Sequence, residues 1–184
     1  MKVVGYTLQG QFNDTYMFRD NSLLAKCEGC GYRLDFSPTN PQYILRKGKE
    51  DFSATYDGQR IVTRAFKDFC EENRYKGVVF RNFENDPDHF HFIVIPEVKF
   101  DAPRRKTRFE NLCPQCGNYE SIVGAKPAYL LIGQAMEDGF YRTDLIFATG
   151  NEKHPVLLVG METKSKLEAA NLKGLEFAPA YGME

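Results

Sequence analysis

The sequence predicts an α+β fold in which two degenerate repeats are joined by one shared four-cysteine site. Three observations predict it. The pattern Cys-x-x-Cys-Gly occurs twice, beginning at Cys27 and at Cys113. Further matched residues follow each pair in the same order. Short runs rich in β-branched residues alternate with stretches at helical spacing, which is typical of mixed sheet and helix.

The bulk composition is that of an ordinary folded protein, with 42% hydrophobic and 27% charged residues. At 184 residues the chain is long enough for one core, and we expect a single domain spanning 1–184. No apolar run approaches the roughly 20 residues that span a bilayer. The opening MKVVGYTLQ has no apolar segment of the kind found in a signal peptide. We therefore expect a cytoplasmic protein with no membrane partner.

The paired cysteines are the strongest chemical signal in the chain. Two residues between cysteines let both sulfurs reach one ion, and a glycine directly after each pair permits the left-handed turn that such a knuckle needs. Four thiolates match the closed tetrahedral site of structural zinc, which leaves no open position for water or substrate. We therefore predict a structural Zn²⁺ ion with ligands at these positions: Cys27, Cys30, Cys113 and Cys116.

The spacing between the pairs is unusually long for such a site. Between Cys30 and Cys113 lie 82 residues, where a compact zinc ribbon has about 15 to 20. Loop-closure entropy rises only slowly with length, so the span is no obstacle. The segments 27–32 and 113–117 also resemble the iron-binding loops of rubredoxin, which keeps iron as an alternative metal.

Matches at constant offsets predict the repeats, with approximate bounds 1–100 and 101–184. The offset is 86 residues near the cysteines and 97 further on, so the second half holds eleven extra residues, most simply around Glu137 to Pro155. At the first offset, Cys27, Cys30, Gly31, Pro41 and Tyr43 match Cys113, Cys116, Gly117, Pro127 and Tyr129. At the second, Val62, Lys67, Glu71, Lys76, Gly77 and Phe80 match Val159, Lys164, Glu168, Lys173, Gly174 and Phe177.

Each half is predicted to run knuckle, strand, strand, helix, strand. Helical spacing covers 65–73 and 164–170, and each stretch runs into Lys-Gly, a pair that often ends a helix. Leu167 and Ala170 are expected on the inner face of the second helix. Runs rich in β-branched or aromatic residues predict the strands, which are expected at 2–8, 60–62, 78–80, 90–96, 144–147, 156–159 and 175–177.

Three other groups could carry chemistry. Cys70 lies four residues after Phe66 on the predicted helix, which favours a buried, inert thiol. His89 and His91 share one strand face; the favoured interpretation is a solvated face, and the alternative is an enzyme that uses them with Asp86 and Asp88. His154 is expected alone in a loop. The common nucleotide-binding, hydrolase and metalloprotease motifs are absent.

The charge pattern leaves a nucleic-acid-binding protein as a further alternative. The formal net charge is −1, whereas affinity for nucleic acid usually requires a basic excess. A local basic run does precede the second knuckle. The favoured interpretation is a solvated loop, and the alternative is a contact with nucleic acid through Arg104, Arg105, Lys106 and Arg108.

The two Cys-x-x-Cys-Gly motifs resemble the double-CXXCG family of myxobacteria and its relatives. The segments 27–31 and 113–117 and the tail 157–179 carry the resemblance. The chain departs from the family in lacking tryptophan near the tail strand, and it has Gly160 and Thr63 where serine is common.

The resemblance implies an immunity protein of a bacterial polymorphic toxin system. Such a protein is not an enzyme; it binds its cognate toxin directly and neutralises it. The expected partner is therefore a cognate toxin protein, with nucleic acid an unlikely one.

Overall fold

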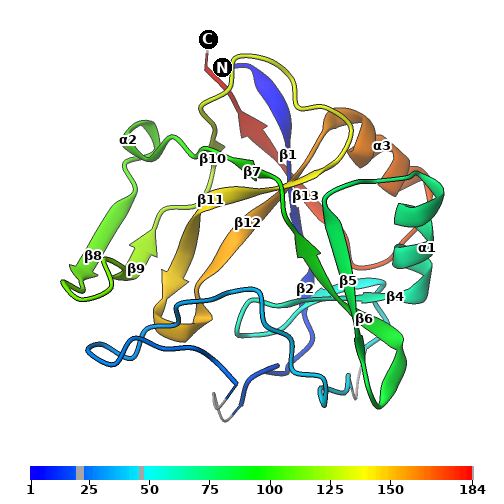
Figure 1. The fold of residues 1–184 in the computed structure, drawn as a ribbon. Coiled ribbons are helices and arrows are strands. Elements are labelled where there is room, and N and C mark those ends of the chain that lie inside the picture. The colour runs from blue at the N-terminus through cyan, green and yellow to red at the C-terminus, as the bar shows by residue number, and fades with distance from the viewer. Residues whose placement is uncertain (20–22, 46–47, 184) are drawn as a thin grey trace.

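The computed structural model describes residues 1–19, 23–45 and 48–183. It confirms an α+β protein that is mostly sheet with few helices (Figure 1). The larger sheet has eight strands in the order β10-β13-β1-β12-β11-β9-β8, with β7 paired to β11. Its strands are β1 (Val3–Gln9), β7 (Glu97–Val98), β8 (Arg108–Leu112), β9 (Tyr119–Val123), β10 (Ala128–Tyr129), β11 (Phe140–Thr149), β12 (His154–Val159) and β13 (Glu176–Tyr181).

The smaller sheet has five strands in the order β2-β3-β4-β6-β5. Its strands are β2 (Gln11–Phe12), β3 (Phe52–Ala54), β4 (Arg60–Thr63), β5 (Val78–Phe83) and β6 (Asp86–Val94). Three α-helices and one 3-10 turn complete the described elements. These are α1 (Arg64–Glu72), α2 (Ala102–Arg105), α3 (Met161–Ala169) and the turn η1 (Gly150–Glu152).

The two longer helices form where the spacing predicts them, but they end earlier than expected. Helix α1 begins after Thr63, whose side chain accepts a hydrogen bond from the Phe66 N–H, and it ends at Glu72. Arg74 and Asn171 follow the two helices in the left-handed conformation, at φ 55° and 54°. The Lys-Gly pairs were therefore wrong as stop signals, because Arg74 and Asn171 end the helices first, although Gly77 and Gly174 do adopt the left-handed conformation at φ 74° and 82°.

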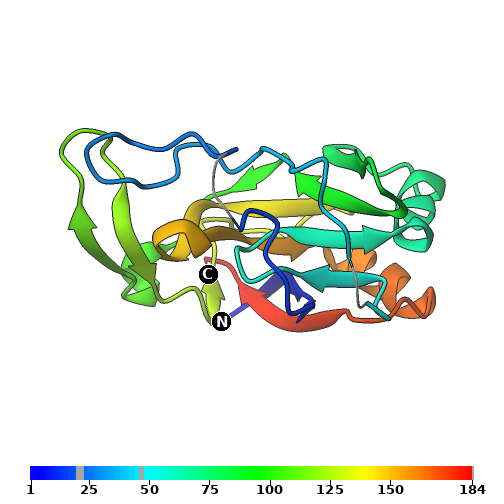
Figure 2. The same cartoon turned by 90° about the horizontal axis from the view of Figure 1, so that it is seen from below.

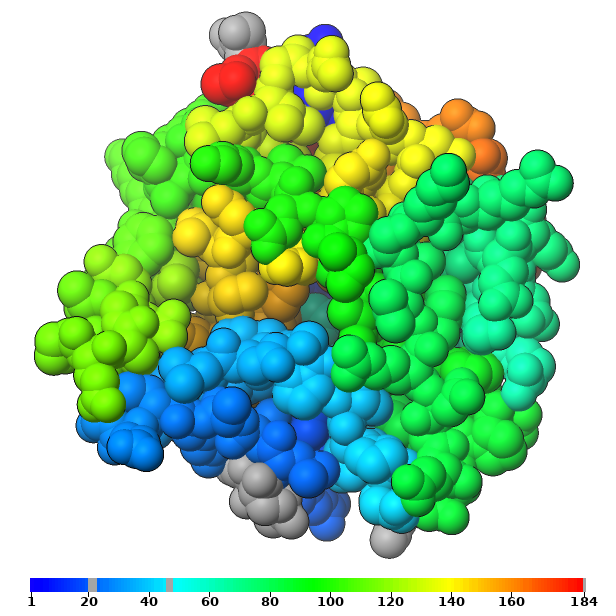
Figure 3. Space-filling view, in the orientation of Figure 1, coloured from blue at the N-terminus to red at the C-terminus, as the bar shows by residue number. Residues whose placement is uncertain are grey.

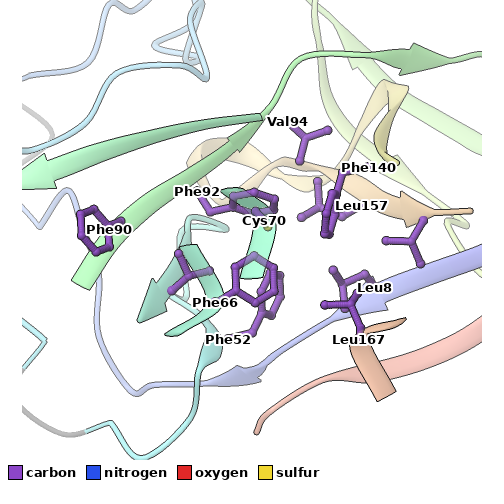
Figure 4. Packing of buried hydrophobic residues seen from close by; sticks show 12 residues of the cluster. Leu8, Phe52, Phe66, Cys70, Phe90, Phe92, Val94, Phe140, Leu157 and Leu167 are labelled. Carbon is purple, nitrogen blue, oxygen red and sulfur yellow. The ribbon is translucent and has the colours of Figure 1, made fainter. Parts of the chain in front are cut away.

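Aromatic packing between the two sheets forms the main core (Figure 4). Phe66 of α1 is fully buried, and its ring lies 5.2 Å from that of Phe92 on β6 and 6.0 Å from that of Phe140 on β11. Leu167 of α3 is buried in the same cluster, whereas Ala170 is exposed, so Ala170 was wrong as an inner-face residue. Each large ring adds roughly 150–250 Å² of buried surface. One core thus holds residues from both predicted halves.

The two sheets share one stretch of strand order. The smaller sheet contains β3-β4-β6-β5, and the larger contains β11-β12-β1-β13. Both stretches have the same register, since Val62 pairs with Phe90 and Val159, 97 positions later, pairs with Tyr6. Helix α3 begins and ends 97 positions after α1. The duplication nevertheless stays a prediction, since shared topology alone does not establish a common origin.

Long loops cover the outer face of the smaller sheet. Ile61 of β4 lies in a separate buried cluster with side chains from two loop segments, which are Met17, Phe18, Tyr43 and Leu45. This cover explains why β6 is buried on both faces. The prediction of a solvated histidine face is therefore wrong for one of its two members, as described below.

Among the residues that the structure describes, no helix is long and apolar enough to cross a lipid bilayer. The two chain ends lie side by side (Figures 1 and 2). The Gly182 N–H donates to the Lys2 carbonyl oxygen at 3.1 Å.

Candidate metal centre

The first knuckle lies in a loop that has little regular structure of its own. Its Cys27 N–H donates to the Tyr32 carbonyl at 2.9 Å, and the Gly31 N–H donates to the Cys27 carbonyl at 2.8 Å. A single antiparallel bridge, between Lys26 and Arg33, flanks this turn. The loop crosses the molecule to reach the end of the β8–β9 hairpin (Figure 2).

The second knuckle is the turn of the β8–β9 hairpin. Its Cys113 N–H donates to the Asn118 carbonyl at 2.8 Å, and the Gly117 N–H donates to the Cys113 carbonyl at 2.9 Å. Strand pairing continues to the edge of the turn, where Leu112 lies opposite Tyr119. The hydrogen bonds of the two knuckles correspond one to one.

The glycine after each cysteine pair adopts the predicted left-handed conformation. Gly31 has φ 71° and Gly117 has φ 69°. A side chain there would meet no atom within 4 Å, so the backbone conformation alone favours glycine. Both turns thus have the geometry that the sequence pattern predicts.

The four predicted ligands come together in space. All four sulfurs lie within 4.8 Å of one another. The Cys27 and Cys113 sulfurs are 4.0 Å apart, and those of Cys30 and Cys116 are 3.7 Å apart. Four sulfurs at about 2.3 Å from one tetrahedral zinc ion would be separated by about 3.8 Å. The arrangement is therefore consistent with one metal ion held by these four residues.

Backbone groups near the sulfurs favour the thiolate form at one position. The N–H of Cys116 points at the Cys113 sulfur and lowers the pKa of that thiol to about 7. Desolvation instead raises the pKa of Cys30 to about 12. Metal binding requires thiolates, so proton release accompanies it.

A buried lysine beside the cluster had not been found from the sequence. Lys153 follows η1 and is only 3% exposed. Its Nζ donates to the Tyr119 carbonyl and lies 5.5 Å from the centre of the Tyr32 ring. Burial lowers the pKa of Lys153, while Cys116 and Cys30 act to raise it. Four thiolates around a divalent ion would carry two surplus negative charges, which this ammonium would offset in part.

The two strand histidines occupy different environments. His91 is 2% exposed, and its Nδ1 lies 2.6 Å from the Thr39 hydroxyl, so a solvated position was wrong for it. The loops described above bury it, and this burial lowers the pKa of His91 to about 3. His89 is half-buried, and its Nδ1 lies 2.8 Å from the Asp86 carboxylate. Asp88 forms a separate exposed pair with Arg64, so these groups do not converge on one site.

Two further sequence expectations have clear outcomes. Cys70 is 1% exposed on α1, which confirms the predicted burial, and this burial raises the pKa of its thiol above the ordinary range. His154 is the first residue of β12 rather than a loop residue, and it packs against Gly58. The β11–β12 hairpin extends farther than the strands predicted at 144–147 and 156–159, and it includes His154.

Two side chains of the basic run take part in internal contacts. Arg104 donates to the Gly182 carbonyl at 2.9 Å and lies over the Tyr129 ring, while Arg105 donates to the Lys126 carbonyl at 2.6 Å. These contacts give the run a structural role at the end of α2. The nucleic-acid and enzyme alternatives stay untested.

Comparison of the sequence with models of known protein families found no match, and neither did comparison with curated proteins.

Proposed function

We propose that this chain is an immunity protein, which neutralises a bacterial toxin by direct contact from a body held together by one structural zinc ion. The convergence of four cysteine sulfurs within 4.8 Å is the observation that carries the structural part of the proposal. Every tetrahedral position is filled from the chain, which suits a metal that stabilises rather than one that reacts.

Zinc is the metal that these ligands favour. Soft thiolates in a tetrahedral set select zinc or iron, and structural zinc sites of this composition are the common case. Iron is the minor alternative, because the two knuckles resemble rubredoxin loops. In either case the metal joins a long loop to a distant hairpin, so that the knuckles act as a staple between the two halves.

The two halves themselves are proposed to be repeats of one ancestral unit. Matching knuckle hydrogen bonds, matching left-handed residues after α1 and α3, and a shared strand order support this. The two stretches differ in the origin of one strand. In the smaller sheet β6 follows β5 in the chain, whereas its counterpart in the larger sheet is β1, which lies near the start of the sequence.

An exposed aromatic cluster supports a protein partner. Phe12, Tyr16 and Tyr56 are 59%, 42% and 38% exposed. The Tyr56 ring lies 5.3 Å from Phe12 and 5.2 Å from Tyr16, and its hydroxyl donates to Asp14 at 2.7 Å. Aromatic side chains held rigid in advance are typical of the residues that dominate binding energy in protein interfaces. The resemblance described above implies that this partner is a toxin, with a cytoplasmic site of action.

Rescue by co-expression tests this function. A toxin encoded beside this gene is expressed in bacteria with the wild-type chain, with Tyr56→Ala, or with Phe109→Ala as a control of similar exposure on β8. We expect survival with the wild type and the control, and reduced survival with Tyr56→Ala. Purified chain and toxin should also form a complex by size-exclusion chromatography. Absence of both rescue and complex would contradict the proposal.

A further inference from the structure

A cavity of about 410 Å³ opens between the two sheets, within the range of pockets that hold small molecules. Its walls come from β6, from the β11–β12 hairpin and from the loop that follows the first knuckle. The hollow is visible near the centre of the space-filling view, between the blue-to-cyan loop, the green strand and the gold hairpin (Figure 3). The metal centre and the cavity thus share one loop.

Arg60 is the unusual group in this wall. The residue is 9% exposed, and its Nη1 donates to the Gly58 carbonyl at 2.8 Å. Its Nε is buried and has no hydrogen-bond partner among the described residues. Burial lowers the pKa of Arg60 to about 10, and no carboxylate offsets that effect. An unpaired buried N–H is costly, so an arginine held in this way favours an acceptor.

The acidic groups of the cavity are already paired with donors. Glu97 lies 2.5 Å from Arg142, and Asp144 accepts from the Phe100 N–H at 2.9 Å. Asp35 accepts from both the N–H and the hydroxyl of Ser37, at 2.8 and 2.7 Å. None of these three carboxylates is therefore paired with Arg60.

A second arginine adds positive potential behind the same loop. Arg33 is fully buried between the rings of Phe18 and Phe36, at 5.1 and 4.9 Å, and both of its terminal nitrogens lack a partner among the described residues. The charges of Arg33, Arg60 and Arg81 all act on His91, which burial keeps neutral. Asp57 and Asp35 act on Arg33, so the arginine in this region whose charge no carboxylate offsets is Arg60.

The rest of the wall is apolar. Side chains from both sheets contribute, among them Phe92, Val94, Ile95, Ile146 and Leu157. We propose that the cavity binds a small organic anion, whose carboxylate or phosphate group accepts from Arg60 and whose apolar part lies against these side chains. This site is independent of toxin binding, and either proposal stands without the other.

Three small probes separate the contribution of the anionic head group from that of the apolar ring. Benzoate and phenyl phosphate carry the anion on a ring, and benzyl alcohol carries a neutral group on the same ring. Binding to the zinc-loaded wild-type chain is measured by calorimetry. We expect both anions to bind and benzyl alcohol to bind at least about tenfold more weakly, as loss of a hydrogen bond to a charged group implies. The tighter of the two anions identifies the class of head group.

Variants test the assignment to Arg60. Arg60→Met should weaken anion binding by at least about tenfold. Arg108 is an exposed arginine outside the cavity wall, so Arg108→Met should leave anion binding unchanged. If Arg60→Met does not fold, amide NMR of the wild type decides, with ligand-induced shifts expected at Ile93 and Ile146. Equal binding of all three probes, no binding, or shifts confined to other surfaces would overturn the proposal.

Discussion

The two knuckles have the same local hydrogen bonds but very different support from the chain around them. The second knuckle is the turn of a hairpin, with paired strands up to Leu112 and Tyr119. The first is held in a loop by a single bridge between Lys26 and Arg33. Identical turn geometry thus occurs once with strand pairing behind it and once almost without.

This difference indicates where a metal contributes most to the structure. A hairpin closes its own turn locally, so the second knuckle has the shape of a ligand pair before any metal binds. The first knuckle must be brought to it across 82 residues, a closure whose entropic cost a metal would offset. We therefore expect metal loss to release the first knuckle and largely spare the second.

Loss of a ligand should have the largest effect. Cys27→Ser and Cys113→Ser should each lose the metal and lower the free energy of unfolding by about 4 kcal/mol or more, because metal binding is coupled to folding. Denaturant unfolding with elemental analysis measures both quantities. Cys70→Ala removes a buried thiol that is not a ligand, so it should retain one metal per chain. Metal retained at full occupancy in either serine variant would contradict the ligand assignment.

Chelation should separate the two knuckles directly. Hydrogen exchange is followed before and after metal removal at the knuckle amides of Gly31 and Gly117. We expect the protection of the Gly31 amide to collapse, and that of the Gly117 amide to fall much less. Equal loss of protection in both segments would show that the hairpin has no stability of its own.

Arg33 should be the main nonmetal support of the first knuckle. Its guanidinium lies between the rings of Phe18 and Phe36. Arg33→Ala should lower the free energy of unfolding by about 2–4 kcal/mol, since it removes two stacking contacts and leaves a hole between them. The exposed Arg108→Ala serves as the control and should change it by less than about 0.5 kcal/mol. A neutral result for Arg33→Ala would contradict this role for the Arg33 side chain.

The glycine substitutions should have the smallest effect, and an equal one. Gly31→Ala and Gly117→Ala each force a side chain into a left-handed backbone but meet no neighbouring atom. Each should cost about 1 kcal/mol in the metal-bound protein, measured by denaturant unfolding. Unequal costs would show that the surroundings, rather than the turn, decide the conformation at one of the knuckles.

The local features of this structure could be predicted from the sequence. Helix α1 follows from the spacing of Phe66 and Cys70, and the ligand set follows from two short motifs. The positions of Lys153 and His91 could not be predicted, because loops without periodicity bury them. Arg60 likewise shows no sequence signal, since its isolation from carboxylates exists only once two sheets and a loop have packed together.

X-ray absorption at the metal edge tests the central claim most directly. The protein is expressed without added iron and purified without chelator, and its metal content is measured first. We predict one zinc per chain with four sulfur neighbours at about 2.3 Å. A folded chain without metal, or a first coordination shell that contains nitrogen or oxygen in place of sulfur, would contradict a site built by both knuckles.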